Sequence, residues 1–197
     1  MNHIFYIMGK SASGKDTIYE TLLSDPSLDL TPLVPWTTRP IRAKETDGVE
    51  YHFTDETVLE QLTREGRVIE QRTYQTEHGP WTYFTVDEGS VSGDLLGIGT
   101  LESYLRLRSY YGENRVIPIY VEVEDGIRLG RALKREYKPG NHRYEEMCRR
   151  FLADQRDFSE DKLTDAGIER RFSNNADRND CIREITEFIH SVQEERE

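Results

Sequence analysis

The sequence predicts an α/β fold in which a parallel sheet carries insertions. Residues 4–8 are a short, continuous apolar run, which is typical of a strand buried on both faces of a parallel sheet. A glycine-rich turn follows this run, and from Lys15 the apolar positions take helical spacing until Ser24 and Pro26. Two further buried-strand patterns, at 94–98 and 116–123, alternate with helical patterns in the second half of the chain.

The other elements are expected in order along the chain. A helix over 55–65 would turn Val58, Leu59 and Leu62 inward, with Asp55 as its N-cap. The remaining expectations are short strands and turns over 33–34 and 37–53, antiparallel strands with a loop at 78–80 over 68–83, helices at 100–111, 127–135, 144–158 and 180–192, and a short strand at 171–173.

Composition indicates a polar globular protein and excludes several classes. The chain has 197 residues, 36% of them hydrophobic and 32% charged, and this suffices for one domain with a core. A net charge of −11 argues against a general nucleic-acid binder. No apolar run approaches the roughly 20 residues that span a bilayer. Two cysteines without a pairing motif and a start unlike a signal peptide favour the cytoplasm, with no membrane partner.

A phosphate-binding loop is predicted between the first strand and the first helix. Its residues match the pattern G-x-x-x-x-G-K in the strand–loop–helix context that gives the pattern its meaning; they are Gly9, Lys10, Ser11, Ala12, Ser13, Gly14 and Lys15. Backbone N–H groups of such a loop wrap a β-phosphate, and Lys15 would reach the β- and γ-phosphates of ATP. A chance glycine-rich turn is the alternative, which the flanking elements disfavour.

The residues after Lys15 leave two interpretations open. Asp16 stands where a Ser or Thr usually follows the lysine, and Thr17 comes next. Asp16 would either bind Mg²⁺, directly or through water, or stabilise the helix start electrostatically. Thr17 would supply the hydroxyl for the metal. The expected cofactor is therefore Mg²⁺ together with ATP.

A second anion site is predicted in the segment from Thr37 to Phe53. Arg39 and Arg42 lie three residues apart in a segment that also contains Tyr51, and guanidinium groups bind phosphate bidentately. A solvated loop is the alternative. Together with the upstream phosphate loop, this segment resembles the guanylate kinase pattern T-T-R-x-P-R-x-G-E-x-x-G-x-x-Y-x-F.

The resemblance extends over most of the chain and implies a single domain. Its fold would be a three-layer P-loop kinase with a parallel core sheet (1–33, 89–128 and 151–197), a small β-rich acceptor-nucleotide-binding insert (34–88) and a helical lid (129–150). The implied reaction moves the γ-phosphoryl group of ATP to GMP or dGMP. The implied partners are ATP and GMP or a related small phosphorylated acceptor, in a monomer or homodimer.

The resemblance also implies roles for single residues. Arg39, Arg42 and Tyr51 would hold the acceptor phosphate, and Glu70 would accept hydrogen bonds from the guanine N–H groups. Tyr83 would add a phosphate contact and Thr85 a base contact, although both also fit ordinary strand positions.

Arginines of the lid and one asparagine complete the implied site. Arg131, Arg135 and Arg150 would stabilise the charge of the transferred phosphoryl group. Arg143 and Arg149 equally fit an exposed helix face. Asn175 would lie near the adenine of ATP, or else cap the final helix.

Two departures from the family pattern concern the acceptor. Leu96-Gly97-Ile98-Gly99 stands where the family has Leu-Asp-Ile-Asp, and Pro35 stands where it has a base-contacting Ser. Asp16 and the pair Asn174-Asn175 also resemble ribose 1,5-bisphosphate phosphokinase, so a sugar-phosphate acceptor is the first alternative. A degenerate module that only binds a phosphorylated ligand is the second.

Charge is distributed unevenly along the chain. Residues 128–156 contain nine Lys or Arg against four acidic residues, a local charge of +5, so the rest of the chain carries −16. The acidic surface is consistent with solubility, while cations gather in the segment where two phosphorylated substrates would meet.

Overall fold

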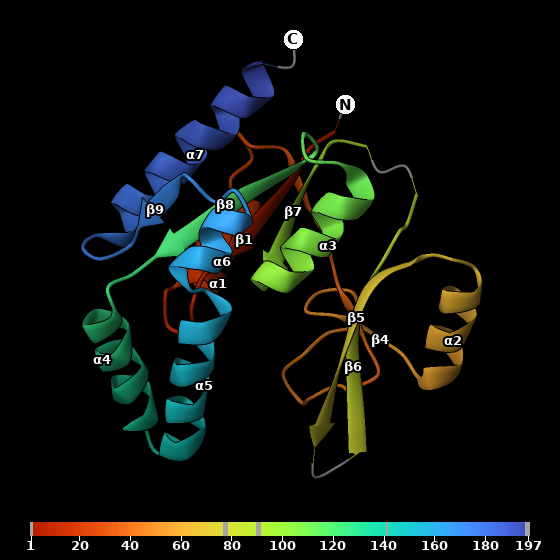
Figure 1. The fold of residues 1–197 in the computed structure, drawn as a ribbon, viewed down its shortest axis with the longest axis horizontal. Helices are drawn as coiled ribbons and strands as arrows, with labels where there is room; N and C mark the ends of the chain where they lie inside the picture. Colours follow the sequence, from red (N-terminus) through yellow and green to blue (C-terminus); the bar gives the residue numbers. More distant parts are fainter. Residues whose placement is uncertain (1, 77–78, 90–91, 141, 196–197) are drawn as a thin grey trace.

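A five-stranded parallel sheet forms the centre of the computed structural model, which describes residues 2–76, 79–89, 92–140 and 142–195 (Figure 1). Every neighbouring pair in the sheet is parallel. The strands, in spatial order, are β2 (Leu30–Pro32), β7 (Asp94–Gly99), β1 (Ile4–Met8), β8 (Val116–Glu122) and β9 (Arg171–Ser173). The predicted α/β class with a parallel sheet is confirmed.

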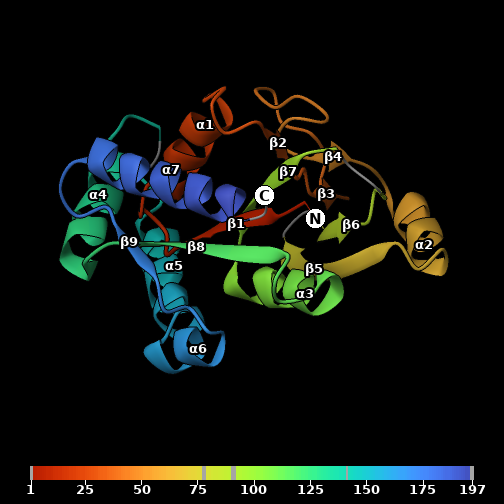
Figure 2. The same ribbon diagram turned by 90° about the horizontal axis from the view of Figure 1, so that it is seen from above.

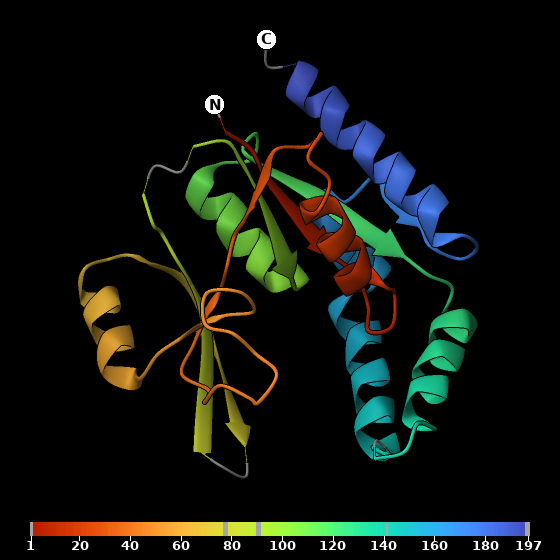
Figure 3. The same ribbon diagram turned by 180° about the vertical axis from the view of Figure 1, so that it is seen from behind.

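Helices cover both faces of this sheet and give three layers (Figures 2 and 3). Alternate side chains of β1 point to opposite faces. Phe5 and Ile7 pack with α1 (Lys15–Leu23) and α7 (Arg178–Glu194). Tyr6 and Met8 pack on the other face, with α3 (Leu101–Tyr111) and α6 (Glu160–Asp165). Because β1 is buried on both faces, all five of its residues are hydrophobic.

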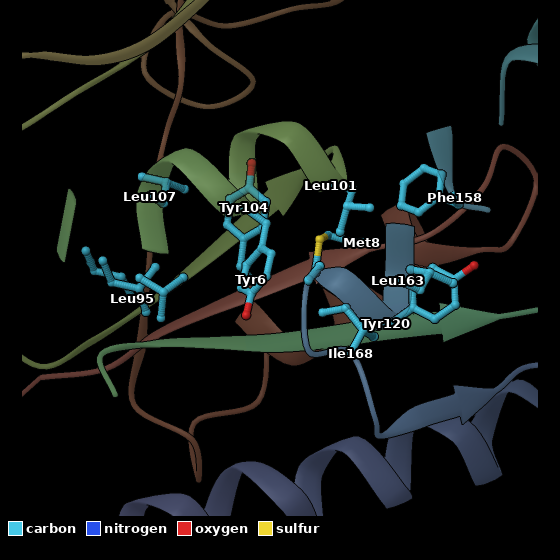
Figure 4. Close-up of a cluster of buried hydrophobic side chains, with 13 residues drawn as sticks. Tyr6, Met8, Leu95, Leu101, Tyr104, Leu107, Tyr120, Phe158, Leu163 and Ile168 are labelled. Carbon is cyan, nitrogen blue, oxygen red and sulfur yellow. The ribbon is translucent and has the colours of Figure 1, made fainter. Parts of the chain in front are cut away.

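Two aromatic contacts join the central sheet to the segments packed against it (Figure 4). Tyr6 lies beside Tyr104 of α3, with ring centroids 6.4 Å apart. Tyr120 of β8 stacks on Phe158 at 5.7 Å. Because Phe158 directly follows α5 (Tyr144–Asp157), this contact holds the end of α5 against the central sheet.

A second, four-stranded sheet contains β4 (His52–Phe53), β3 (Trp36–Thr37), β6 (Gly79–Val86) and β5 (Val68–Thr76), in that order. Helix α2 (Glu56–Arg64) packs against it through Leu59 and Leu62, which contact a cluster with Phe84 and Val86. As predicted, Asp55 caps α2, and its carboxylate accepts a hydrogen bond from the Val58 N–H at 3.0 Å.

Helices α4 (Asp125–Glu136) and α5 lie side by side, and they extend from the same end of the central sheet as the β5–β6 hairpin (Figures 1 and 3). Arg128, only 1% exposed, joins the two helices. Its Nε donates to Asp125 at 2.6 Å, its Nη1 donates to Asp154 at 3.3 Å, and its guanidinium lies 3.9 Å from the Phe151 ring centroid.

Two elements were not predicted from the sequence. Strand β2 has three residues at the sheet edge, two of them exposed, so it carries no apolar pattern. Helix α6 has six residues, which is too short for helical periodicity to be visible. Among the described residues, no helix is long and apolar enough to span a membrane. Of the loop expected at 78–80, residue 78 lies outside the described residues.

Candidate active site

The loop between β1 and α1 requires glycine at two positions. A Cβ on Gly9 would lie 2.6 Å from the Val121 carbonyl oxygen. Gly14, the N-cap of α1, has a φ of 89°, and a Cβ there would lie 2.7 Å from Asn174 Nδ2. Ala12 also has a positive φ, of 64°. This tight, left-handed backbone places the loop at the N-terminus of α1, where a helix favours anions.

Asn174 supports the loop from the segment between β9 and α7. This residue is buried, and its Nδ2 donates to the Ser13 carbonyl at 2.7 Å. The backbone carbonyl of Asn174 accepts from Arg131 Nη2 at 2.8 Å. Sequence reasoning noted Asn174 only as part of a resemblance, because a contact across 161 positions leaves no local pattern.

Asn175 does not cap α7, so that alternative is wrong. The cap is Asp177, whose carboxylate accepts from the Asn179 N–H at 2.9 Å. The Asn175 side chain instead accepts from the Glu124 N–H at 2.8 Å. Several residues here are good helix caps, and spacing alone did not distinguish them.

Lys15 and Asp16 are the first two residues of α1. Lys15 Nζ lies 3.3 Å from Asp16 Oδ2, and the Asp16 side chain is 78% exposed. Asp16 therefore lies in the first turn of the helix, and Thr17 follows it with an exposed side chain. A carboxylate and a hydroxyl are hard oxygen ligands of the kind Mg²⁺ takes. Within the described chain no cluster of three metal-ligating side chains exists, so Mg²⁺ would need phosphate and water oxygens as well.

One cleft of about 370 Å³ brings the loop and the second sheet together. Gly9, Ser11, Lys15 and Asp16 line it from the loop side. From the other side it is lined by predicted acceptor residues and their neighbours, which are Pro35, Tyr51, Glu70, Arg72, Tyr74, Tyr83 and Thr85. Asp154 and Phe158 line it from α5 and the residue that follows.

Glu70 is buried in the cleft wall, with both carboxylate oxygens engaged. Thr85 Oγ1 donates to Glu70 Oε1 at 2.9 Å. Arg72 Nε donates to Glu70 Oε2 at 3.1 Å, and Arg72 Nη1 donates to Thr100 Oγ1 at 3.1 Å. Sequence reasoning missed Arg72. Its place in the site could have been inferred from the two-residue period of a strand, which places positions 70 and 72 on one face of β5.

Arg39 and Arg42, which were predicted to hold the acceptor phosphate, are not among the residues that line this cleft, and Arg39 is held by Glu45. Arg39 is 2% exposed, and its Nη2 and Nη1 donate to the two oxygens of Glu45 at 2.8 and 2.9 Å. Its guanidinium lies 5.5 Å from the Tyr51 ring centroid. The hydrogen bond from Arg39 holds the pKa of Glu45 below its usual range. Arg42 is exposed, and its backbone N–H also donates to Glu45 at 2.8 Å.

Two tyrosines form an aromatic wall beside Arg39. Tyr51 and Tyr83 meet edge to face, with centroids 5.5 Å apart. Burial raises the pKa of Tyr51, so its hydroxyl is neutral and able to donate at neutral pH.

Tyr6 explains why residues 97 and 99 are glycines. A Cβ on Gly97 would lie 2.6 Å from Tyr6 Cδ2, and one on Gly99 would overlap the Tyr6 hydroxyl. Burial raises the pKa of Tyr6 far above its usual range. A neutral phenol therefore occupies the space beside positions where the resembling family has carboxylates.

The three predicted lid arginines lie along α4 and α5. Arg131 contacts Asn174, Arg135 pairs with Glu136 at 3.5 Å, and Arg150 pairs with Glu146 at 2.8 Å. Arg135 and Arg150 line a small hollow that also includes Ser11 of the loop. Hydrogen bonds from Arg149 and Arg150 lower the pKa of Glu146 to about 2.

The loop is also tied to α5 by contacts that the sequence did not predict. Asp154 Oδ2 accepts from the Ser11 N–H at 2.8 Å, and Lys10 Nζ donates to Gln155 Oε1 at 2.6 Å. These two hydrogen bonds join the phosphate loop to α5, and Arg128 joins α5 to α4.

The central sheet and the loop after its first strand define a P-loop α/β protein. A family model described as guanylate kinase matches residues 1–84. Curated guanylate kinases from Listeria monocytogenes serotype 4b (strain F2365) and Mycoplasmoides gallisepticum are 34% and 39% identical over 71 residues, which is 36% of this chain and 35% and 36% of theirs. One from Streptococcus mutans is 35% identical over 85 residues, or 41% of this chain and 40% of the relative.

The structural comparison covers almost the entire chain. The crystal structure of guanylate kinase from Anaplasma phagocytophilum matches with a TM-score of 0.60 and 18% identity, over 98% of this chain and 86% of that one. This likeness confirms the fold. The family model adds a similarity to guanylate kinase over residues 1–84. The sequence match itself spans little more than a third of the length of the first curated relatives.

Proposed function

We propose that this chain is a guanylate kinase-like phosphotransferase that moves the γ-phosphoryl group of ATP to GMP or dGMP, giving ADP and GDP. One observation carries the proposal: a single cleft is lined by the phosphate loop on one side and by Tyr51, Glu70, Tyr83 and Thr85 on the other. The similarity to guanylate kinases fits the same reaction. We also propose the cytoplasm as its compartment, since Cys148 and Cys181 are both free.

On the donor side, the loop N–H groups and Lys15 would hold the ATP phosphates. Mg²⁺, when bound, would neutralise phosphate charge, with Asp16 and Thr17 supplying oxygen atoms directly or through water. Asn175 would lie near the adenine.

On the acceptor side, cations would hold the phosphate and a carboxylate would read the base. Arg39 is pre-organised by Glu45, while exposed Arg42 has room to move onto a phosphate. Tyr51 and Tyr83 would donate hydroxyl hydrogen bonds. Glu70 and Thr85 would face the guanine, because their side chains share one wall of the cleft.

The chemistry needs positioning more than it needs a base. The acceptor phosphate is already an anion at neutral pH, so the protein's task is to align two phosphates and offset their repulsion. We propose 129–150 as a lid that brings Arg131, Arg135 and Arg150 over the phosphates and excludes water. In this division 34–88 is the acceptor-binding insert, and the rest of the chain is the core.

An assay of ADP release with a panel of acceptors tests the proposal. GMP and dGMP should be turned over well above the background ATP hydrolysis, while AMP and UMP should not. Turnover of ribose 1,5-bisphosphate but not GMP would replace the proposal with the sugar-phosphate alternative. No ADP release with any acceptor would favour the binding module.

A further inference from the structure

Arg72 and Glu70 form a fixed pair in the wall of the cleft. Their side chains are 19% and 3% exposed, so Arg72 retains a surface toward the cleft while Glu70 is almost enclosed. Thr100, the N-cap of α3, anchors Arg72 from the central sheet side through Nη1. Both charges are thus oriented by contacts from two different parts of the fold.

Arg72 has hydrogen-bonding capacity left over. A guanidinium carries five N–H donors. Within the described chain, its hydrogen bonds to Glu70 and Thr100 use one N–H from each of its three nitrogens. Two donors remain for a molecule in the cleft.

The pair presents a pattern of hydrogen-bonding groups that matches guanine. The pairing edge of guanine has two adjacent donors, N2–H and N1–H, followed by the acceptor O6. Three hydrogen bonds already occupy Glu70, from Thr85 and Arg72 Nη2 to Oε1 and from Arg72 Nε to Oε2. Of the roughly four acceptor sites of a carboxylate, one therefore remains, on Oε2, and the pair presents one acceptor beside a donor, which matches N1–H and O6. Adenine has an amino donor in place of O6 and an acceptor at N1, so both positions would be mismatched.

We propose that Arg72 is a specificity-determining residue that donates a hydrogen bond to the guanine O6, while Glu70 accepts from N1–H. This assignment rests on the proposed function, because it presumes GMP as the acceptor. Pro35 lines the same cleft but has no hydroxyl or N–H with which to donate a hydrogen bond to O6. Arg72 can supply that hydrogen bond instead. Arginine is a frequent partner of guanine O6 for the same reason of geometry.

The test compares kcat/KM for GMP and for 6-thio-GMP, whose sulfur accepts hydrogen bonds weakly but whose N1–H and N2–H are retained. The wild-type chain should prefer GMP by about tenfold or more, the worth of one hydrogen bond to a charged group. Arg72→Met should reduce this preference to near one, with KM for ATP unchanged. Arg72→Lys should restore part of it. Arg183→Ala, which removes an exposed arginine from α7, is the matched control and should behave like the wild type.

The outcomes separate the two proposals. If the wild type uses GMP but Arg72→Met lowers kcat/KM equally for both nucleotides, Arg72 only positions Glu70 and the assignment is wrong. If the wild type uses GMP and 6-thio-GMP equally well, the assignment fails without any variant, even where Arg72→Met does not fold. If the wild type uses neither, the proposed function fails, and the assignment fails with it.

Discussion

Single residues set the electrostatics of the cleft. Lys15 stands at the start of α1 with Asp16 as its partner, while Glu70 is enclosed by Thr85 and Arg72. The two sites differ in burial, because the Lys15 partner is exposed to solvent and the Glu70 carboxylate is not. Lys15 lies on the loop side of the cleft, which is proposed to bind ATP, and Glu70 lies on the side proposed to bind GMP. Changes at the two residues should therefore affect different substrates.

Lys15→Ala should lower kcat by about 10²–10³-fold or more, the range for removing one group that stabilises transition-state charge. Its effect should appear in ADP release at saturating GMP. Lys162→Ala, which removes an exposed lysine from α6, is the control. Wild-type rates for the Lys15 variant would refute the role of the loop.

Glu70→Gln should raise KM for GMP by about tenfold or more while leaving KM for ATP within about twofold, since the amide replaces one acceptor with a donor. Steady-state kinetics with each substrate varied in turn would show this. Glu56→Gln on the exposed face of α2 is the matched control. An equal loss for ATP and GMP would mean that Glu70 is structural.

The sequence allowed prediction of the residues whose signal is local. Gly9, Gly14 and Lys15 are recognisable because a loop of this geometry needs them at fixed spacing. Arg72 was missed although it lies two residues from Glu70 on the same face of β5. The roles of Asn174 and Tyr6 were not predicted, because each acts through a contact with a distant segment. Tyr6 in particular accounts for Gly97 and Gly99, a link that is visible only once β1 and β7 pair.

At the scale of elements, the pair α4–α5 depends on one buried cation. Arg128 connects Asp125 at the start of α4 with Asp154 near the end of α5, and Asp154 in turn accepts from the loop. The longer helices and strands were predicted from apolar patterns, and the short strands within 37–53 from composition. The exceptions, β2 and α6, are too short to show a period.

Arg128→Ala should destabilise the fold by about 3 kcal/mol, the low end of the cost of breaking a buried ion pair, because both aspartates lose their shared partner. Urea unfolding followed by circular dichroism would measure the loss. Arg178→Ala, at an exposed position of α7, should change stability little. A loss below about 0.5 kcal/mol, the usual size of a surface change, would contradict the role given to Arg128.

At the scale of the whole molecule, basic residues concentrate in the segment 128–156, while the described lining of the cleft contains two cations, Lys15 and Arg72, and three carboxylates, Asp16, Glu70 and Asp154. The net charge of −11 therefore does not by itself identify the ligand. The two cysteines differ in burial, because Cys148 is exposed on α5 and Cys181 lies on the buried face of α7.

Burial raises the pKa of Cys181 to about 11, so little of it is thiolate at pH 8. A disulfide reagent at pH 8 should modify one thiol per chain rapidly and the second only after unfolding. Cys148→Ser should abolish the fast phase. Rapid modification of both thiols in the native state would contradict the packing of α7.

The central claim is that one cleft holds both phosphorylated substrates at once. Calorimetric titration with guanosine and adenosine joined by a five-phosphate bridge tests it most directly, with GMP and ATP as the separate reference ligands. The account predicts one site per chain, affinity at least about a hundredfold above either single nucleotide because the two ends are linked, and weaker binding after either Lys15→Ala or Arg39→Ala. Binding no tighter than that of GMP or ATP alone would contradict the claim.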